Sequence, residues 1–216
     1  MVKLEQRSVE VELKYQVCQD RSNTIEKLIR WLDTNATSGE EVELKNIYFD
    51  TPERLLNKHK MGLRIRRAGD WGEQTIKLAG KQQGAVSERP EYNVETKALR
   101  PDLHLFPTHI WPEHWRLKEL NNALEPQFEV TFTRRTWLYH GEGYSAEIAL
   151  DLGLIIAAGK QEAVQELELE LKAGSAEPLL ELGAELAALF QLEPGLKSKA
   201  QRGYELYAER FPSQGS

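Results

Sequence analysis

Residues 9–15 read Val9-Glu10-Val11-Glu12-Leu13-Lys14-Tyr15, with apolar and charged side chains in strict alternation. Successive side chains of a β-strand point to opposite faces of a sheet, so this run predicts a strand over residues 8–18. One face of that strand is apolar, and the other carries two acids and one base. The fold depends on whether this charged face meets bulk water or the inside of a closed barrel.

Similar strand signals recur along the chain and are separated by turns and short polar stretches. Beside residues 8–18, we expect strands at 45–50, 62–68, 73–80, 87–95, 126–139, 144–152 and 164–172. Helical stripes predict helices at 25–33, 53–59, 178–191 and 196–211, with a polar loop at 34–43 and short turns or helices between 96 and 123. The pattern therefore predicts about eight strands flanked by helices.

Charged side chains sort by sign from strand to strand. The acids are Glu10, Glu12, Glu147, Asp151, Glu168 and Glu170; the bases are Arg64, Arg66, Lys77 and Arg134. Exposure to water explains each strand alone, because charged residues are mostly exposed. It gives no reason for the sorting, whereas a barrel that encloses a hydrated polar ligand does.

Both kinds of charge suit a polyphosphate that binds together with divalent metal ions. Mg²⁺ and Mn²⁺ prefer carboxylate oxygens, while phosphate oxygens pair with arginine and lysine. Phosphoryl transfer relies mainly on positioning and on charge neutralisation. No Walker-type P-loop is present, so a triphosphate would be held by these strands instead.

Composition sets wider limits on the function. The 216 residues are 40% hydrophobic and 29% charged, with a formal net charge of −6. The acidic surface argues against general nucleic-acid binding, and no apolar stretch is long enough to span a membrane. A single cysteine, Cys18, precludes an internal disulfide, and the first residues do not resemble a signal peptide. We therefore expect a cytoplasmic protein with a single domain over residues 1–216, as a monomer or a homodimer.

The motif Glu10-x-Glu12-x-Lys14 resembles the signature of the CYTH superfamily, the triphosphate tunnel metalloenzymes. Further motifs follow in family order over nearly the whole chain: Tyr48-Phe49-Asp50-Thr51-Pro52, Leu63-Arg64-Ile65-Arg66, Thr75-Ile76-Lys77, Arg89-Pro90-Glu91-Tyr92, Arg134-x-x-Trp137, Glu147 to Asp151, Glu166 to Leu171 and Ser198-Lys199. One E-x-E-x-K motif alone is weak, but eight motifs in order are specific.

This resemblance implies an α+β fold that is mainly antiparallel β: a closed eight-stranded tunnel with flanking helices, of which those at 175–211 pack on the barrel. It implies metal ligands at Glu10, Glu12, Asp151, Glu168 and Glu170, and phosphate ligands at Lys14, Arg64, Arg66, Lys77, Arg89, Arg134 and Lys199. Catalytic roles fall to Lys14, Glu168 and Glu170, with Glu91 and Glu147 as secondary candidates. The cofactor implied is Mg²⁺ or Mn²⁺, as two ions.

The segment from Arg89 to Val94 and the Trp111-Pro112 region are most similar to the bacterial inorganic triphosphatases of this superfamily. The expected reaction is hydrolysis of inorganic triphosphate to diphosphate and phosphate. Many of those enzymes carry a further helical domain, and this sequence ends at Ser216 without it. The sequence leaves open whether the chain is a stand-alone member or a shortened one.

Other functions remain open within the same fold. A class IV-type adenylate cyclase, a thiamine triphosphatase or a nucleoside triphosphatase would need a pocket for an organic group, which the sequence does not identify. A non-catalytic polyphosphate binder is a further alternative. The complete acidic set argues against it, because binding alone needs the bases more than the water-positioning acids.

Overall fold

The computed structural model describes residues 4–17 and 23–208, and within them all side chains except those of residues 4–10 and 82. The strands are β1 (Leu4–Gln16), β2 (Thr37–Asp50), β3 (Gly62–Ala68), β4 (Trp71–Lys77), β5 (Lys81–Gln83), β6 (Val86–Glu95), β7 (Glu125–Gly141), β8 (Tyr144–Ala157), β9 (Lys160–Gly174) and β10 (Glu193–Pro194). The helices are α1 (Thr24–Asn35), α2 (Leu55–Lys58), α3 (Leu117–Ala123), α4 (Ala176–Phe190) and α5 (Lys199–Ala208), with 3₁₀ turns η1 (Leu103–Leu105) and η2 (Thr108–Ile110).

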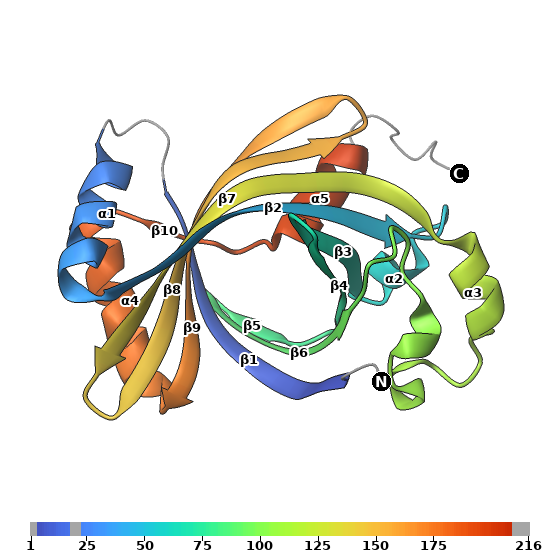
Figure 1. The fold of residues 1–216 in the computed structure, drawn as a ribbon, viewed down its shortest axis with the longest axis horizontal. Helices are drawn as coiled ribbons and strands as arrows, with labels where there is room; N and C mark the ends of the chain where they lie inside the picture. The colour runs from blue at the N-terminus through green and yellow to red at the C-terminus, as the bar shows by residue number, and fades with distance from the viewer. Residues whose placement is uncertain (1–3, 18–22, 209–216) are drawn as a thin grey trace.

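Eight of the described strands close into an antiparallel barrel. They run in the order β1-β9-β8-β7-β2-β3-β4-β6, and pairing between β1 and β6 closes the ring. In this last pair Glu10 lies opposite Arg89 and Glu12 lies opposite Ser87. The short strands β5 and β10 join at β6 and β1 (Figure 1). The predicted closed eight-stranded barrel is thus confirmed.

The outside of the barrel is covered at two places by apolar packing. On one side, Leu13 of β1 packs in a cluster with Leu28 and Leu32 of α1 and with Leu182 of α4. On the other side, the segment between β6 and β7 places η1, η2 and α3 against β3, β4 and β6. Figure 1 shows these two covers at opposite ends of the view. The odd-numbered face of β1 is therefore the outer one, and Glu12 and Lys14 point inward.

Helix α5 packs on the inner face of the barrel, whereas α4 packs on the outer one. Tyr204 of α5 shares a buried cluster with Phe132 and Val164. Phe132 precedes Arg134 by two positions, and Val164 precedes Glu166 by two, so α5 lies on the face that carries the charges. Gly203 permits this approach, because a Cβ there would lie 2.2 Å from Cε2 of Phe128.

A capping box starts α5 inside the barrel. The Ser198 hydroxyl accepts a hydrogen bond from the Gln201 amide, and the Gln201 side chain accepts one from the Ser198 amide (3.1 and 2.8 Å). These bonds fix the first helical turn, so the position of Lys199, the first residue of α5, is well defined. None of the helices in the described ranges is both long and apolar enough to cross a bilayer.

Each predicted strand and helix is present, with boundaries that differ by up to five residues from the prediction, and there is one larger exception. The predicted loop at 34–43 is wrong, because β2 begins at Thr37 and pairs with β7 along its whole length. Residues 37–41 of this strand are exposed, so their side chains show no apolar alternation. Backbone hydrogen bonds to β7 hold this part of the strand, and a pattern of side chains cannot reveal them.

Asp50, at the end of β2, joins three parts of the fold. Its buried carboxylate accepts hydrogen bonds from the backbone amides of Thr51, Leu56 and Asn57 and from the Tyr204 hydroxyl, all at 2.8–2.9 Å. Burial raises the pKa of Asp50, and these hydrogen bonds oppose that rise. One side chain therefore holds the start of α2 and the interior helix α5 in fixed positions.

We predict that Asp50→Ala lowers the free energy of unfolding by at least about 3 kcal/mol, because four buried donors lose their acceptor. Urea denaturation followed by circular dichroism measures the loss. Asp70→Ala, in the exposed turn after β3, is the control and should change the value by less than about 0.5 kcal/mol. Equal losses in the two variants would contradict this role of Asp50.

Candidate active site

A cavity of about 770 Å³ occupies the inside of the barrel and is lined mainly by charged side chains. Its bases are Lys14, Lys60, Arg64, Arg66, Lys77, Arg89, Arg134, Lys172 and Lys199, and its acids are Glu12, Glu73, Glu91, Glu147, Glu168 and Glu170. Among the described side chains this makes nine bases and six acids, a formal charge of +3. The whole chain carries −6, so the cavity has the opposite sign to the protein around it.

The structure brings nearly all the predicted site residues to this cavity. Each predicted phosphate ligand lines it, as do the predicted acids Glu12, Glu168 and Glu170 and the secondary candidates Glu91 and Glu147. Asp151 is fully buried and contacts residues of the lining. The side chain of Glu10 and all of Cys18 fall outside the described part, so the proposed metal-ligand role of Glu10 stays a prediction.

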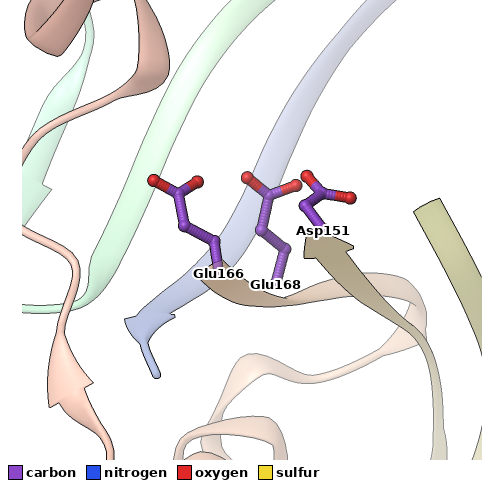
Figure 2. Close-up of side chains that lie close together, drawn as sticks. All are labelled: Asp151, Glu166 and Glu168. Atoms are coloured by element: carbon purple, nitrogen blue, oxygen red, sulfur yellow. The ribbon is translucent and has the colours of Figure 1, made fainter. Parts of the chain in front are cut away.

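A group of three carboxylates lies at one side of the cavity. Asp151 on β8 and Glu166 and Glu168 on β9 place oxygen atoms within 4.8 Å of one another. Figure 2 shows the three carboxylates side by side, pointing in one direction from two neighbouring strands. Asp151 and Glu166 are fully buried, and Glu168 is part-buried at the cavity wall.

Three cations bind this group directly: Lys199, Arg134 and, through Glu166, Arg202. The Lys199 ammonium lies 2.8 Å from Asp151, 2.5 Å from Glu166 and 2.8 Å from Glu168. Arg134 donates two hydrogen bonds of 2.7 Å to Asp151 and one of 2.5 Å to Glu168. Although burial opposes its charge, the three acids raise the pKa of Lys199 well above its ordinary value. Burial likewise favours the neutral form of Glu168, but Lys199 and Arg134 hold its pKa well below the usual range.

The basic wall is built by β3 and its neighbours. Arg66 donates a hydrogen bond to Asn46 and lies 3.9 Å from Glu73. Burial, and after it repulsion from Arg64 and Arg134, lowers the pKa of Arg66 to about 10. Arg66 therefore stays charged at neutral pH, and an anion in the cavity would relieve the repulsion among these guanidinium groups.

Several charged groups on the wall carry unsatisfied hydrogen-bonding capacity. The Nε atoms of Arg64 and Arg89 are buried, with no hydrogen-bond partner among the described residues. By contrast, Lys77 is paired with Glu91 at 2.6 Å. Buried polar atoms without partners are rare in native structures and each calls for an explanation, such as a bound ion or ligand. Two such donors on one basic wall suggest that this wall binds an anion.

Lys14 and Glu12 face the cavity from β1, and the pKa values of both side chains are shifted from their ordinary values. Burial lowers the pKa of the Lys14 ammonium, against the attraction of Glu166, Glu12 and Glu168. Burial also raises the pKa of Glu12, and repulsion from Glu168 adds to this rise. Neither side chain has a hydrogen bond or ion pair to any other described residue. Groups shifted in this way are suited to proton transfer or to binding a cation.

The carboxylates that line the cavity supply hard oxygen donors, which fit Mg²⁺ or Mn²⁺. Glu12 projects next to Glu170, its partner across the β1–β9 ladder, and Glu170 lies opposite Glu147 on β8. Lys172 lies 2.9 Å from Glu170 and 3.5 Å from Glu147, and its side chain is 39% exposed. Glu170 and Glu147 therefore share one partly exposed counter-ion, which a metal ion could replace, and Glu12 lies beside them.

Sequence reasoning did not select two residues that the structure places here. In the sequence Glu166 is only one member of an alternating strand, and Arg202 belongs to none of the motifs. Arg202 lies three positions after Lys199, hence on the same face of α5, and donates a 2.6 Å hydrogen bond to Glu166. The helical spacing of three residues predicts that Lys199 and Arg202 lie on one face of α5. Their common partner Glu166 follows only from how α5 docks on β9.

We predict that the pKa of Glu12 in the metal-free protein lies above the ordinary glutamate value, as a ¹³C NMR titration of its carboxyl group would show. Glu168→Gln should lower this pKa, because it removes the repelling charge, while burial keeps it above the ordinary value. Glu181→Gln, on the exposed face of α4, should leave it unchanged.

The raised pKa of Glu12 also determines how its contribution to the stability of the fold depends on pH. Because the folded-state pKa is raised, the contribution of Glu12 is present below its ordinary pKa and is lost as the pH rises through the folded-state value. A Glu12 pKa at or below the ordinary value would contradict this account of the site.

Comparison with known proteins agrees with the architecture and the motifs. Residues 8–204 match the CYTH domain family. An inorganic triphosphatase of Haemophilus influenzae is 34% identical over 173 residues, which cover 78% of this chain and 47% of that protein. The chain thus spans about half the length of this curated relative.

Two solved structures share the fold at low identity. One is a candidate adenylyl cyclase from Hippeastrum with a dominant triphosphatase activity (TM-score 0.61, 16% identity, 96% of this chain and 100% of that chain). The other is a candidate adenylate cyclase from Bacillus halodurans (TM-score 0.58, 20% identity, 97% of this chain and 100% of that chain). With a match over residues 8–204 and the predicted barrel in place, this chain belongs to the CYTH domain family.

Proposed function

We propose that this chain hydrolyses inorganic triphosphate to diphosphate and phosphate with the help of Mg²⁺ or Mn²⁺. The observation that carries the proposal is the cavity inside the barrel, which has a formal charge of +3 in a chain of charge −6. Such an excess of positive charge attracts a compact polyanion. The 34% identity to an inorganic triphosphatase supports the same substrate class.

The proposed phosphate ligands are the bases of the cavity. Arg64, Arg66 and Arg89 present guanidinium groups, which suit the paired oxygens of phosphate, while Lys14 and Lys77 act as point charges. Arg134 and Lys199 remain predicted phosphate ligands, although both already donate to carboxylates. Together these groups would align the phosphate chain and spread its charge, and such positioning supplies most of the catalysis in phosphoryl transfer.

Glu12, Glu168 and Glu170 are the described acids that we propose to hold the divalent ion, with Glu10 as a further predicted ligand. A bound ion would supply charge neutralisation at the phosphate oxygens and would activate a water molecule. Glu168 and Glu170 would orient that water and accept its proton. The lowered pKa of Lys14 brings it nearer to neutrality, so it could assist proton transfer to the leaving phosphate.

We propose a cytoplasmic protein, because a chain with one cysteine needs no oxidising compartment. Two metal ions are the number that the family resemblance implies. A monomer and a homodimer both remain compatible with a site built from one barrel.

A substrate panel tests the proposal directly. Phosphate release from inorganic triphosphate, ATP and thiamine triphosphate is measured side by side with Mg²⁺ and with Mn²⁺. We expect turnover to be fastest with inorganic triphosphate and to vanish when a chelator removes the metal. Faster release from an organic triphosphate, or formation of cyclic AMP from ATP, would replace the proposal by one of the alternatives.

The acids of β9 provide a second test. We predict that Glu168→Gln and Glu170→Gln each reduce kcat for triphosphate by at least about 100-fold, because each removes charge and a proton acceptor next to the reacting group. Glu113→Gln, an exposed change between η2 and α3, should keep full activity. If both β9 variants turned over triphosphate at the wild-type rate, a binding protein without catalysis through β9 would be the better interpretation.

A further inference from the structure

Lys199 occupies the place in the carboxylate group where a bound cation would lie. Its ammonium is within 2.8 Å of one oxygen on each of Asp151, Glu166 and Glu168. An ammonium group has three N–H donors, so three carboxylates use its full donor capacity. Three acids around one cation is also the arrangement in which a protein holds a divalent ion.

The remaining oxygens of the group are occupied as well. Arg134 binds Asp151 through both carboxylate oxygens and also reaches Glu168. The other Glu166 oxygen accepts hydrogen bonds from Arg202 and from Gln16, at 2.6 and 2.9 Å. The three negative charges thus meet three positive ones, from Lys199, Arg134 and Arg202. A divalent ion could bind here only by displacing a buried ion pair, and that displacement is unfavourable because it leaves a buried charge uncompensated.

Arg202 ties this arrangement to the fold. Besides Glu166, it donates hydrogen bonds to Glu162 at 2.6 Å and to the Ala163 carbonyl at 2.5 Å. Arg202 therefore joins α5 to β9 through three partners, Glu162, Ala163 and Glu166. Since Lys199 lies one helical turn earlier, these links hold its ammonium against the carboxylate group.

Next to this group, further along β8 and β9, the acids are available. Glu12 has no hydrogen bond or ion pair to another described residue. Glu170 and Glu147 share the partly exposed Lys172. A cation can bind at these acids without breaking any of the buried contacts around Lys199.

We infer that the Lys199 ammonium is the resident cation of the Asp151–Glu166–Glu168 group. Asp151, Glu166 and Arg202 are then positioning residues for Lys199 and α5, and the divalent ion binds toward Glu12 and Glu170. The inference rests on the proposed function only for the presence of a divalent ion in the cavity. It changes the ligand sets proposed above. Both oxygens of Asp151 and of Glu168 are already bound, so these two acids leave the metal-ligand set, and Lys199 has no N–H donor left for phosphate.

Mn²⁺ binding tests the inference without measuring turnover. Isothermal titration of the full chain with Mn²⁺ alone gives the affinity and the number of ions bound. We expect Glu166→Gln to change the affinity by less than about 2-fold and Glu12→Gln to weaken it at least about 10-fold. Lys199→Met should bind one additional Mn²⁺, and adding Glu166→Gln to it should remove that ion. Lys199→Arg, which keeps the positive charge, is the control and should gain none.

Loss of an ion in Glu166→Gln, or no extra ion in Lys199→Met, would overturn the inference. Hydrogen exchange of the wild-type chain provides a measurement that does not depend on folding of the variants. Saturating Mn²⁺ should leave the exchange of the α5 amides unchanged, whereas faster exchange would mean that the metal displaces Lys199. If the wild type binds no Mn²⁺, the proposed metal-dependent function fails, and an extra ion in Lys199→Met still supports the assignment of Lys199.

Discussion

Pairing of β1 with β6 is the interaction on which the rest of the structure depends. It converts a twisted sheet into a closed barrel, so that the charged face of each strand becomes an interior surface. A charge removed from water is costly unless opposite charges and hydrogen bonds compensate for it. Closure therefore selects which side chains can occupy the inner face, and acids and bases must meet across the cavity.

Buried charges are fully paired with opposite charges in one part of the cavity and only partly paired in another. Around Lys199, three acids and three bases balance and fill their hydrogen-bonding capacity. Along β3 and β6, the bases exceed the acids, and buried Nε atoms of Arg64 and Arg89 lack partners. We assign the first region to a structural ion-pair network and propose the second as a binding surface for an anion. This difference follows from where the charges lie, because both regions contain the same residue types.

Helix α5 decides the shape of the interior. A barrel of eight strands has room for side chains or one small ligand, and here an amphipathic helix takes up part of that room. Its apolar residues pack on Phe128 and Phe132, while its first turn presents Lys199 to the cavity. Gly203 and the hydrogen bond between Tyr204 and Asp50 hold it at this depth. The cavity is consequently confined to the polar half of the barrel.

The sequence by itself determined the strands, their two faces and the separation of acids from bases, because alternation is a local property of an extended chain. It missed the first part of β2, whose exposed residues are held by backbone pairing with β7. It also placed Asp151 and Lys199 in a site without showing that they bind each other. Only the tertiary structure decided these partners, and with them the roles of Glu166 and Arg202. The reason is physical: a side-chain pattern specifies which way a group points, whereas the docking of α5 and the closure of the barrel specify which opposite charge it meets.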